Sequence, residues 1–385
     1  MKIALLSEKY TPDVGGLAIS AERLARLLAS AGHSLHVFSP TLSLSGFERR
    51  TVDMNGIAVT RFGAHKRVDD TLQAWFELVV DEHKRQRFDL LHAYFLVQAG
   101  FVTAYAGKYL QVPSVVSARG NDLERAVFDP SRAAHILYAL RNASAVTANA
   151  SELARKARAL VPGLHVGVIP NGVDTDRFRP ALRNNALAES LNLINRGRAG
   201  QAWRVIGFAG ELREKKGLHP LLGAYAQVIK QLPAALLIVG EVRAGEDSRA
   251  LEEFRQLHPE CHIIVTGTMP AGDMPAYYSV MDVFVQPSLR DGLPNALLEA
   301  MACGKAVIGT TAGGIPDILT DGVNGRIVST NHTEDLAETI RDLLADEEQR
   351  RRLGMAACQT IRSRFTLRQE LDGNQAVYRR LGLPL

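Results

Sequence analysis

Two carboxylates follow a predicted strand late in the chain, and their spacing indicates how they would be used. Asp291 lies in an Asp-Gly turn, and Glu299 comes eight positions later inside a predicted helix whose other residues are apolar. A carboxylate among apolar neighbours needs a partner, because burying an unpaired charge is costly. Ligand hydroxyls or a buried salt bridge would each supply one. Eight positions are too many for one acid/base pair on a single helical turn, so we expect the two carboxylates to hold two parts of one ligand, such as a sugar and a ribose.

The turn between these carboxylates has the makings of a phosphate site. Gly292 follows Asp291 directly, and Pro294 suits the first turn of a helix, where its missing N–H is not needed. The first amides of a helix have no partner within the helix and favour anions. The amides near Leu293 and Asn295 are therefore predicted to face a phosphate.

A cationic loop follows the strand predicted at 204–208. Gly210 ends that strand and Gly217 begins the next helix, with Arg213 and Lys216 between them. At the carboxyl edge of a strand, Lys offers a point charge and Arg a fork for a diphosphate. A solvated run of charges is the alternative interpretation.

The loop after the first strand carries a pair of glycines. Pro12 stiffens it, and Gly15 and Gly16 lead into a helix. Glycine lets backbone amides approach a ligand closely, and a helix start favours an anion. A simple strand-to-helix turn is the alternative. The sequence has no G-x-G-x-x-G after either first strand, which counts against an NAD or FAD enzyme.

Short apolar runs alternate with amphipathic stretches along the whole chain. This alternation predicts parallel strands joined by right-handed crossovers, and hence an α/β fold with doubly wound sheets. It pauses over the polar stretch 180–201 and restarts at 204–208, so we expect two Rossmann-like domains. Parallel sheets bind ligands at the carboxyl ends of their strands. The predicted strands are 2–6, 35–38, 58–62, 90–92, 114–117, 145–147, 166–169, 204–208, 235–239, 262–266, 283–286, 306–309 and 325–328.

Composition describes a globular chain with a small positive charge. The 385 residues are 46% hydrophobic and 22% charged, which excludes disordered, collagen-like and coiled-coil classes. The net charge is +4, and residues 1–180 carry 22 basic and 17 acidic side chains, a net of +5. Scatter explains this excess, or the first half meets an anionic partner such as a phosphorylated substrate or a lipid surface. A dense basic patch is absent from the sequence, so nucleic acid is not expected as a partner.

The cysteines and apolar runs bear on where the protein works. Cys261, Cys303 and Cys358 form neither a metal-ligand spacing nor a disulfide framework, which suits a reducing compartment. The apolar start is too short for a signal peptide, and His92 interrupts the run 90–107, so no transmembrane segment is expected. We expect a cytoplasmic protein that can touch a membrane from the inner face.

Five motifs in register resemble one enzyme family. The Asp291…Glu299 stretch resembles the E-x7-E signature of retaining glycosyltransferases of the GT-B fold, in family 4, also called group 1. Four further stretches are similar to motifs of that family, in the same order along nearly the whole chain. They are Pro12…Gly15-Gly16, Ile169-Pro-Asn-Gly-Val-Asp174, Gly210…Lys216-Gly217, and Ala312-Gly-Gly-Ile-Pro-Asp317 with Gly322-Val-Asn-Gly325.

The resemblance implies two Rossmann-like domains facing across a cleft. An acceptor domain would cover 1–175 and a donor domain 176–366, with a last helix at about 367–385 packing back on the first. The reaction would transfer a sugar from a UDP-, GDP- or ADP-sugar to a carbohydrate, lipid-linked or small-molecule acceptor, with the anomeric configuration retained. The nucleotide sugar is a co-substrate, and neither a cofactor nor a metal is implied. Asp174-Thr-Asp176 has the letters of a metal-binding D-x-D motif but belongs to the boundary segment.

The resemblance also assigns roles to residues. Glu299 would bind the ribose hydroxyls and Asp291 the donor sugar, while Lys216 and Arg213 would bind the diphosphate and stabilise the departing charge. The implied donor site comprises Gly15, Gly16, Gly210, Arg213, Lys216, Asp291, Gly292, Leu293, Pro294, Asn295 and Glu299. The implied catalytic groups are Asp291, Lys216, Arg213 and Arg119. On the acceptor side the expected residues are Arg119, Asn121, Asp122, His92 and Asn171.

Three positions depart from the family pattern. Asp291 replaces the first Glu of the signature, Glu211 stands where the family has Arg, and Arg119 replaces the His of an H-G-x-D segment. Arg119 either binds an anionic group or is a structural loop arginine. His92, at a strand end, is either a structural histidine or a catalytic base. These departures keep two alternatives open, a nucleotide-sugar epimerase of the same fold and a catalytically impaired nucleotide-sugar-binding protein.

Overall fold

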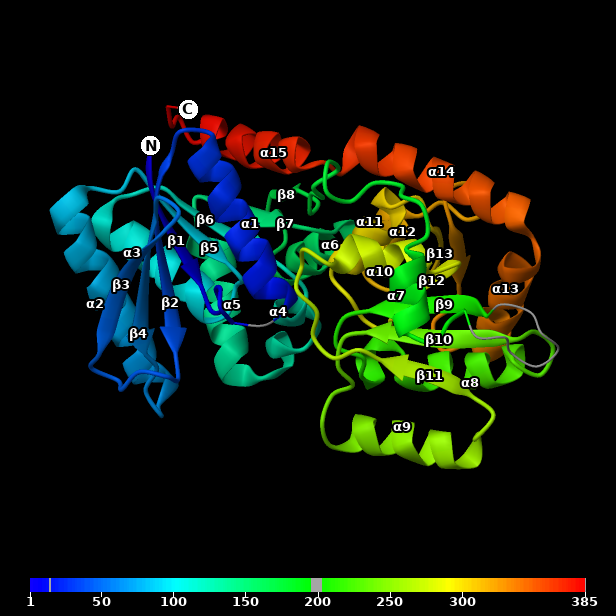
Figure 1. Ribbon diagram of the computed structural model, residues 1–385. Helices are drawn as coiled ribbons and strands as arrows, with labels where there is room; N and C mark the ends of the chain where they lie inside the picture. Colours follow the sequence, from blue (N-terminus) through cyan, green and yellow to red (C-terminus); the bar gives the residue numbers. More distant parts are fainter. Residues whose placement is uncertain (14, 195–202, 385) are drawn as a thin grey trace. The chain divides into compact units, whose positions relative to one another are not determined.

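The computed structural model describes all residues except 14, 195–202 and 385, and divides the chain into two compact units (Figure 1). Unit 1 comprises Met1–Asn171 and Leu367–Leu385, and unit 2 comprises Gly172–Thr366. Residues 172–175, predicted in the first domain, are thus part of unit 2. The reason is that the Val173 N–H donates to the Phe365 carbonyl at 2.8 Å, which joins this segment to the end of the last helix of unit 2. Part of the predicted polar boundary, 195–202, lies outside the described residues.

The sheet of unit 1 is doubly wound. Its eight described strands follow the order β3-β4-β2-β1-β5-β6-β7-β8, and all neighbours pair in parallel except β3 with β4. β5 and β6 are buried at every residue, as expected where helices cover both faces. The strands are β1 (Lys2–Ser7), β2 (Ser34–Thr41), β3 (Arg49–Met54), β4 (Ile57–Gly63), β5 (Leu90–Tyr94), β6 (Ser114–Ala118), β7 (Ala145–Ala148) and β8 (Val166–Val168).

Helices cover the two faces of this sheet with separate cores. One core includes Trp75 of α2, Val102 of α3 and Leu140 of α5, and the other includes Leu24 of α1 and Tyr378 of α15. The helices of unit 1 are α1 (Gly16–Ser30), α2 (Val68–Gln86), α3 (Gln98–Leu110), α4 (Asn121–Glu124), α5 (Pro130–Asn142), α6 (Ser151–Leu160) and α15 (Leu367–Arg380).

The antiparallel edge strand β3 was not predicted from the sequence. Its residues are mostly exposed, so no buried apolar alternation marks it. The signal that could have found it is the Asn55-Gly56 turn, where both residues have positive φ (58° and 80°) and join β3 to β4 as a hairpin. The Asp53 carboxylate accepts the Gly56 N–H at 2.9 Å and closes the turn.

Unit 2 repeats the doubly wound pattern with a smaller sheet. Its described strands follow the order β11-β10-β9-β12-β13-β14, all parallel. The strands are β9 (Arg204–Ala209), β10 (Ala234–Val239), β11 (His262–Val265), β12 (Val283–Gln286), β13 (Ala306–Thr310) and β14 (Arg326–Val328). The helices are α7 (Asn185–Ser190), α8 (Leu218–Val228), α9 (Glu246–Leu257), α10 (Met274–Val280), α11 (Asn295–Ala302), α12 (Ile315–Ile318), α13 (Thr333–Ala345) and α14 (Glu347–Arg364).

The last helix, α15, is fastened to unit 1 by polar contacts as well as by its apolar face. In Figure 1 it lies beside α1, and Glu370 of α15 forms an ion pair with Arg23 of α1 at 2.7 Å. The buried Tyr378 hydroxyl is 2.7 Å from Nδ1 of His92 on β5. These contacts orient the helix, whereas apolar packing alone would tolerate sliding.

The hydrogen bond between His92 and Tyr378 should stabilise the folded protein. Replacing Tyr378→Phe leaves the buried Nδ1 of His92 without its partner, so the free energy of unfolding in urea should fall by about 1–3 kcal/mol. Tyr109→Phe is the matched control, because the Tyr109 side chain on α3 is 66% exposed. Equal stabilities for the two variants would contradict the assignment.

Candidate functional site

Three neighbouring strands of unit 2 end beside the residues predicted to bind the donor. β9, β12 and β13 are adjacent in the sheet, and parallel strands bring their carboxyl ends to one edge. The loop after β9 carries Lys216, the loop after β12 carries Asp291, and the loop after β13 carries Gly313. The topology therefore assembles three motifs that lie far apart in the sequence.

The first two loops touch through backbone atoms. Gly217 has a φ of 84°, and a Cβ added there would lie 1.9 Å from the Pro287 carbonyl oxygen. The Lys215 carbonyl accepts the N–H groups of Leu289 and Arg290 at 3.0 and 3.3 Å. Only glycine satisfies both the left-handed conformation and this close approach.

This contact brings Lys216 and Asp291 together as an ion pair. Their side chains are only 21% and 12% exposed, so the charges are largely removed from water. The Asp291 carboxylate also accepts from the Ser288 hydroxyl at 3.1 Å and the Gln286 amide at 3.4 Å. The family resemblance assigned Lys216 and Asp291 to different parts of a ligand, and the structure pairs them with each other.

The third loop closes against the second. Gly313 has a φ of 56°, and a Cβ there would lie 1.6 Å from the Asp291 carbonyl oxygen. The Gly314 N–H donates to the Gly292 carbonyl at 2.7 Å. The backbone on both sides of the Asp291 side chain is thereby fixed.

Glu299 lies on α11, directly after these loops. Its carboxylate accepts from the Tyr278 hydroxyl at 2.7 Å, a partner that the sequence did not identify. Burial and the nearby carboxylate raise the pKa of Tyr278 well above its usual value, so the phenol stays a hydrogen-bond donor. Pro294 stands immediately before α11, and Leu293 is buried. Glu299 is half-buried, and Asn295 begins the helix.

Arg213 shares its loop with the residue that departs from the family pattern. Its guanidinium is 3.2 Å from the Glu211 carboxylate, and its buried Nε has no hydrogen-bond partner among the described residues. The ion pair with Glu211 thus orients the guanidinium.

The backbone of Gly210 in the same loop lies close to Gly240. A Cβ added at Gly240 would come within 2.2 Å of the Gly210 carbonyl oxygen.

In unit 1, Arg119 and Asn171, two of the residues predicted for the acceptor, lie in contact with each other. The Arg119 guanidinium lies 4.0 Å from the centre of the Tyr94 ring and donates to the Asn171 side-chain oxygen. Asp122 is buried, and its carboxylate accepts the N–H groups of Gly120 and Leu123 at 2.8 and 3.0 Å. Its oxygens thus stabilise the start of α4 rather than facing solvent. Asn121 is exposed at the same turn.

The structure favours a structural role for His92. The side chain is fully buried, Nδ1 contacts Tyr378, and Nε2 lies 2.9 Å from the Ser117 hydroxyl. Burial, and to a smaller extent the nearby Arg119 charge, lower the pKa of His92 to about 3. Because both ring nitrogens are engaged, His92 is not placed to accept a proton from a ligand.

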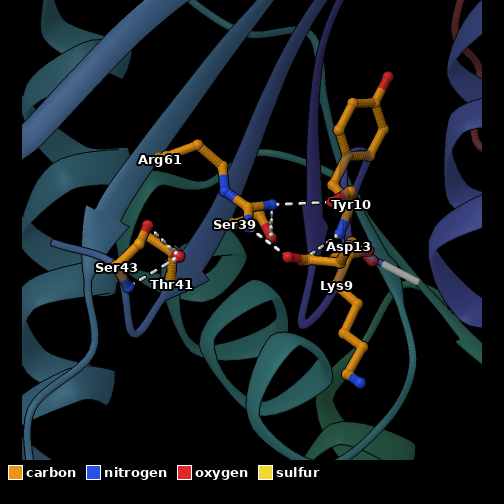
Figure 2. A network of polar contacts seen from close by, with 8 residues as sticks. Lys9, Tyr10, Asp13, Ser39, Thr41, Ser43 and Arg61 are labelled. Carbon is orange, nitrogen blue, oxygen red and sulfur yellow. Dashed lines mark hydrogen bonds and ion pairs between the residues drawn. The ribbon is translucent and has the colours of Figure 1, made fainter. Parts of the chain in front are cut away.

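The glycine pair of the first loop opens α1, and a polar network lies beneath it. Gly15 has a φ of 128°, and a Cβ added at Gly15 or Gly16 would meet no described atom within 4 Å. Figure 2 shows Arg61 of β4 reaching the loop. Sequence reasoning missed Arg61, although a charged residue inside the otherwise apolar strand 57–63 was a signal.

One surface cavity of unit 2 lies away from the predicted residues. A surface cavity of about 530 Å³ lies beside α9, and its lining, which includes Glu241, Arg249 and Arg255, contains none of the predicted residues. In the part of the chain that the structure describes, no three His, Cys, Asp or Glu side chains gather as a metal would require. No helix among the described residues has the length and apolarity to cross a bilayer.

Comparison with known families decides the identity. Residues 14–177 match the family described as Glycosyltransferase Family 4, and residues 195–360 match Glycosyl transferases group 1. The chain belongs to the group 1, family 4 glycosyltransferases. Its two Rossmann-like units are the GT-B fold, and the family makes it a transferase of glycosyl groups.

Relatives of this glycosyltransferase align along nearly its whole length. N-acetyl-alpha-D-glucosaminyl L-malate synthase of Bacillus anthracis is 24% identical over 95% of this chain and 94% of its own. Among solved structures, sucrose-phosphate synthase of Thermosynechococcus elongatus superimposes with a TM-score of 0.82 at 21% identity, covering 99% of this chain and 98% of that one. Anabaena HepE in complex with UDP-glucose gives a TM-score of 0.79 at 22% identity, covering 99% of both. These two structures share the fold.

One buried carboxyl of the glycosyltransferase has an unusual acidity. Glu8 follows β1, and its carboxylate accepts the Gln98 N–H at 2.8 Å at the start of α3. Burial raises the pKa of Glu8 from 4.5 to about 7, although amides of Gln98 and Ala99 oppose the shift. The folded state therefore binds this proton more tightly than the unfolded state does.

The glycosyltransferase should lose the stability linked to Glu8 as pH rises. This contribution is complete below pH 4.5 and is lost between pH 4.5 and about 7, because the folded pKa is the higher one. Glu8→Gln cannot ionise, so relative to the wild type it should gain up to about 3 kcal/mol between pH 4.5 and 8. Urea unfolding at both pH values measures the difference, and Glu77→Gln, at an exposed position on α2, is the control. A pH-independent difference for Glu8→Gln would refute the assignment.

Proposed function

We propose that this glycosyltransferase moves a sugar from a nucleoside-diphosphate sugar to an acceptor, with retention of the anomeric configuration. The observation that carries the proposal is the Lys216–Asp291 pair at the carboxyl edge of the unit 2 sheet, followed on α11 by Glu299. A cation and a carboxylate on neighbouring loops, with a second carboxylate on the helix that follows, suit a ligand that has a diphosphate, a sugar and a ribose. The Asp291…Glu299 spacing supports retention, through the family signature it resembles.

In the proposed donor complex, the ion pair would exchange partners. The diphosphate would take the Lys216 ammonium, and the Asp291 carboxylate would accept sugar hydroxyls while Ser288 and Gln286 keep it oriented. Glu299, held by Tyr278, would accept the ribose hydroxyls. No charge is left unpaired before or after the exchange, which limits the desolvation penalty.

Catalysis would rest on stabilising the departing diphosphate. The bond from the anomeric carbon to the diphosphate oxygen breaks, and the acceptor oxygen bonds to the same face of that carbon. The acceptor proton passes to the departing phosphate oxygen. Lys216 and Arg213 would meet the negative charge that develops on the leaving group, and fixed charges of this kind are usually the largest catalytic contribution. We propose that neither a metal nor a cofactor is needed.

Unit 1 would bind an acceptor with anionic character. Arg119 is half-buried beside Asn171, and residues 1–180 carry the net positive charge of +5. A phosphorylated or lipid-linked acceptor suits this charge, in the cytoplasm or at the inner face of a membrane. Raising the salt concentration should then weaken acceptor binding, because screening acts on exposed charges.

A panel of nucleotide sugars tests the proposed function directly. Relatives named as GDP-mannose-dependent mannosyltransferases and a UDP-glucose complex of Anabaena HepE make UDP- and GDP-sugars the first probes. The true donor should raise the melting temperature, because it binds only the folded state. Turnover with that donor and NMR of the product then give the acceptor and the anomeric configuration. An inverted product would contradict retention. An epimerised donor without transfer would indicate the epimerase, and binding without turnover the impaired protein.

The Glu299 carboxylate should contribute more to binding of the nucleotide than to binding of the sugar. Glu299→Ala removes a charged acceptor for the ribose hydroxyls, so UDP or GDP should bind about 1.5–3 kcal/mol more weakly in calorimetry. Lys216→Met is the contrasting variant, because it should reduce turnover far more than nucleoside binding. Unchanged nucleotide affinity in Glu299→Ala would remove the ribose role.

A further inference from the structure

Arg61 and its ion-pair partner Asp13 together bind both backbone groups of Tyr10, in the first loop of unit 1. Arg61 Nη1 donates to the Tyr10 carbonyl at 3.0 Å and to the Ser39 hydroxyl at 3.2 Å, and Nη2 donates to the Asp13 carboxylate at 2.7 Å (Figure 2). The other oxygen of Asp13 accepts the Tyr10 N–H at 3.0 Å. The Arg61–Asp13 ion pair thus clamps Tyr10 from two sides.

Further contacts within unit 1 hold the same loop. The Tyr10 ring is 1% exposed in the core shared with α1, and the Thr11 hydroxyl donates to Glu22 of α1. The Ser7 hydroxyl donates to the Lys9 carbonyl at 2.7 Å. In Figure 2 the Lys9 side chain points away from the Arg61–Asp13 pair. Residues 9–13 of the loop between β1 and α1 are therefore held by contacts within unit 1.

Stability alone is a poor explanation for Arg61. Its side chain is 15% exposed in a strand whose neighbours Thr60 and Phe62 are buried, and partly buried ion pairs add little stability compared with apolar packing. A guanidinium fork instead fixes geometry, since it bridges two acceptors in one plane. Burial raises the pKa of Asp13, but the hydrogen bonds from Arg61 and the Tyr10 amide outweigh it and hold the pKa below its usual value. The clamp therefore stays charged at neutral pH.

The clamp ends just before the two glycines. Gly16 opens α1 at a position where an added Cβ would meet no described atom within 4 Å, so packing within the chain does not require a glycine there. A ligand approaching the backbone would require one.

We propose that Arg61 is a positioning residue for the transfer reaction, acting with Asp13 to hold the loop that leads to Gly15 and Gly16. The inference rests on the proposed function and on the donor role that the family resemblance implies for these glycines. Arg61 itself touches the loop and not the reacting atoms.

Steady-state kinetics of Arg61→Met, Arg61→Lys and Asp13→Asn test the inference, with the donor that the wild type uses. Arg61→Met and Asp13→Asn should each lower kcat at least tenfold, while UDP or GDP affinity stays within twofold, because unit 2 holds the nucleoside. Arg61→Lys should rescue only part of the loss, since an ammonium cannot bridge both acceptors as a planar fork does. The double variant Arg61→Met/Asp13→Asn should lose no more kcat than either single variant, because the two residues act as a unit.

A matched arginine separates positioning from folding. Arg158 of α6 donates to the Val166 carbonyl at 3.1 Å, and Arg158→Lys should lower the melting temperature with unchanged kcat. The inference would be overturned, and the proposed function left standing, if Arg61→Met kept the wild-type kcat. The same holds if its loss of kcat equals the fraction of unfolded protein measured by circular dichroism. A wild type that turns over no nucleotide sugar would overturn the proposed function and this inference together.

Discussion

Close approach between backbones, which only glycine permits, underlies the site in unit 2. Gly217 and Gly313 each place their Cα where a side chain would strike the neighbouring loop. These contacts bring the two loops together, and Lys216 and Asp291 form an ion pair between them. The chemistry of the site is thus decided by residues that have no side chain of their own.

Asp291 in unit 2 and Asp13 in unit 1 are both paired, but with partners of different kinds. Asp291 is held by a lysine and a hydroxyl, partners that a diphosphate sugar could replace one for one. Asp13 is held by the guanidinium of Arg61 and the backbone amide of Tyr10, both of which belong to the loop and the strand beside it. One arrangement is suited to exchange and the other to permanence, which agrees with a binding role for the first and a supporting role for the second.

Much of this organisation could be predicted from the sequence, because it is local. The alternation of elements predicted two doubly wound sheets, and Asp291, Glu299 and Lys216 could be proposed as donor residues because their motifs are contiguous. Contacts between distant segments could not be predicted. The hydroxyl of Tyr278 on Glu299, the reach of Arg61 to Tyr10, and the engagement of both nitrogens of His92 all depend on the register between strands. The resemblance placed Asp122 and His92 on the acceptor side, but it could not show that both side chains are buried and hydrogen-bonded within unit 1.

The membership of α15 in unit 1 has a consequence for how the chain reaches its native state. Unit 1 is interrupted by the whole of unit 2, and its second core includes Val377 and Tyr378. On the ribosome, residues 1–171 are made before α15, a helix that helps to cover one face of their sheet, whereas all of unit 2 is made before α15. Unit 2 can therefore fold before α15 is made, whereas unit 1 cannot complete its second core until α15 has followed unit 2 out of the exit tunnel.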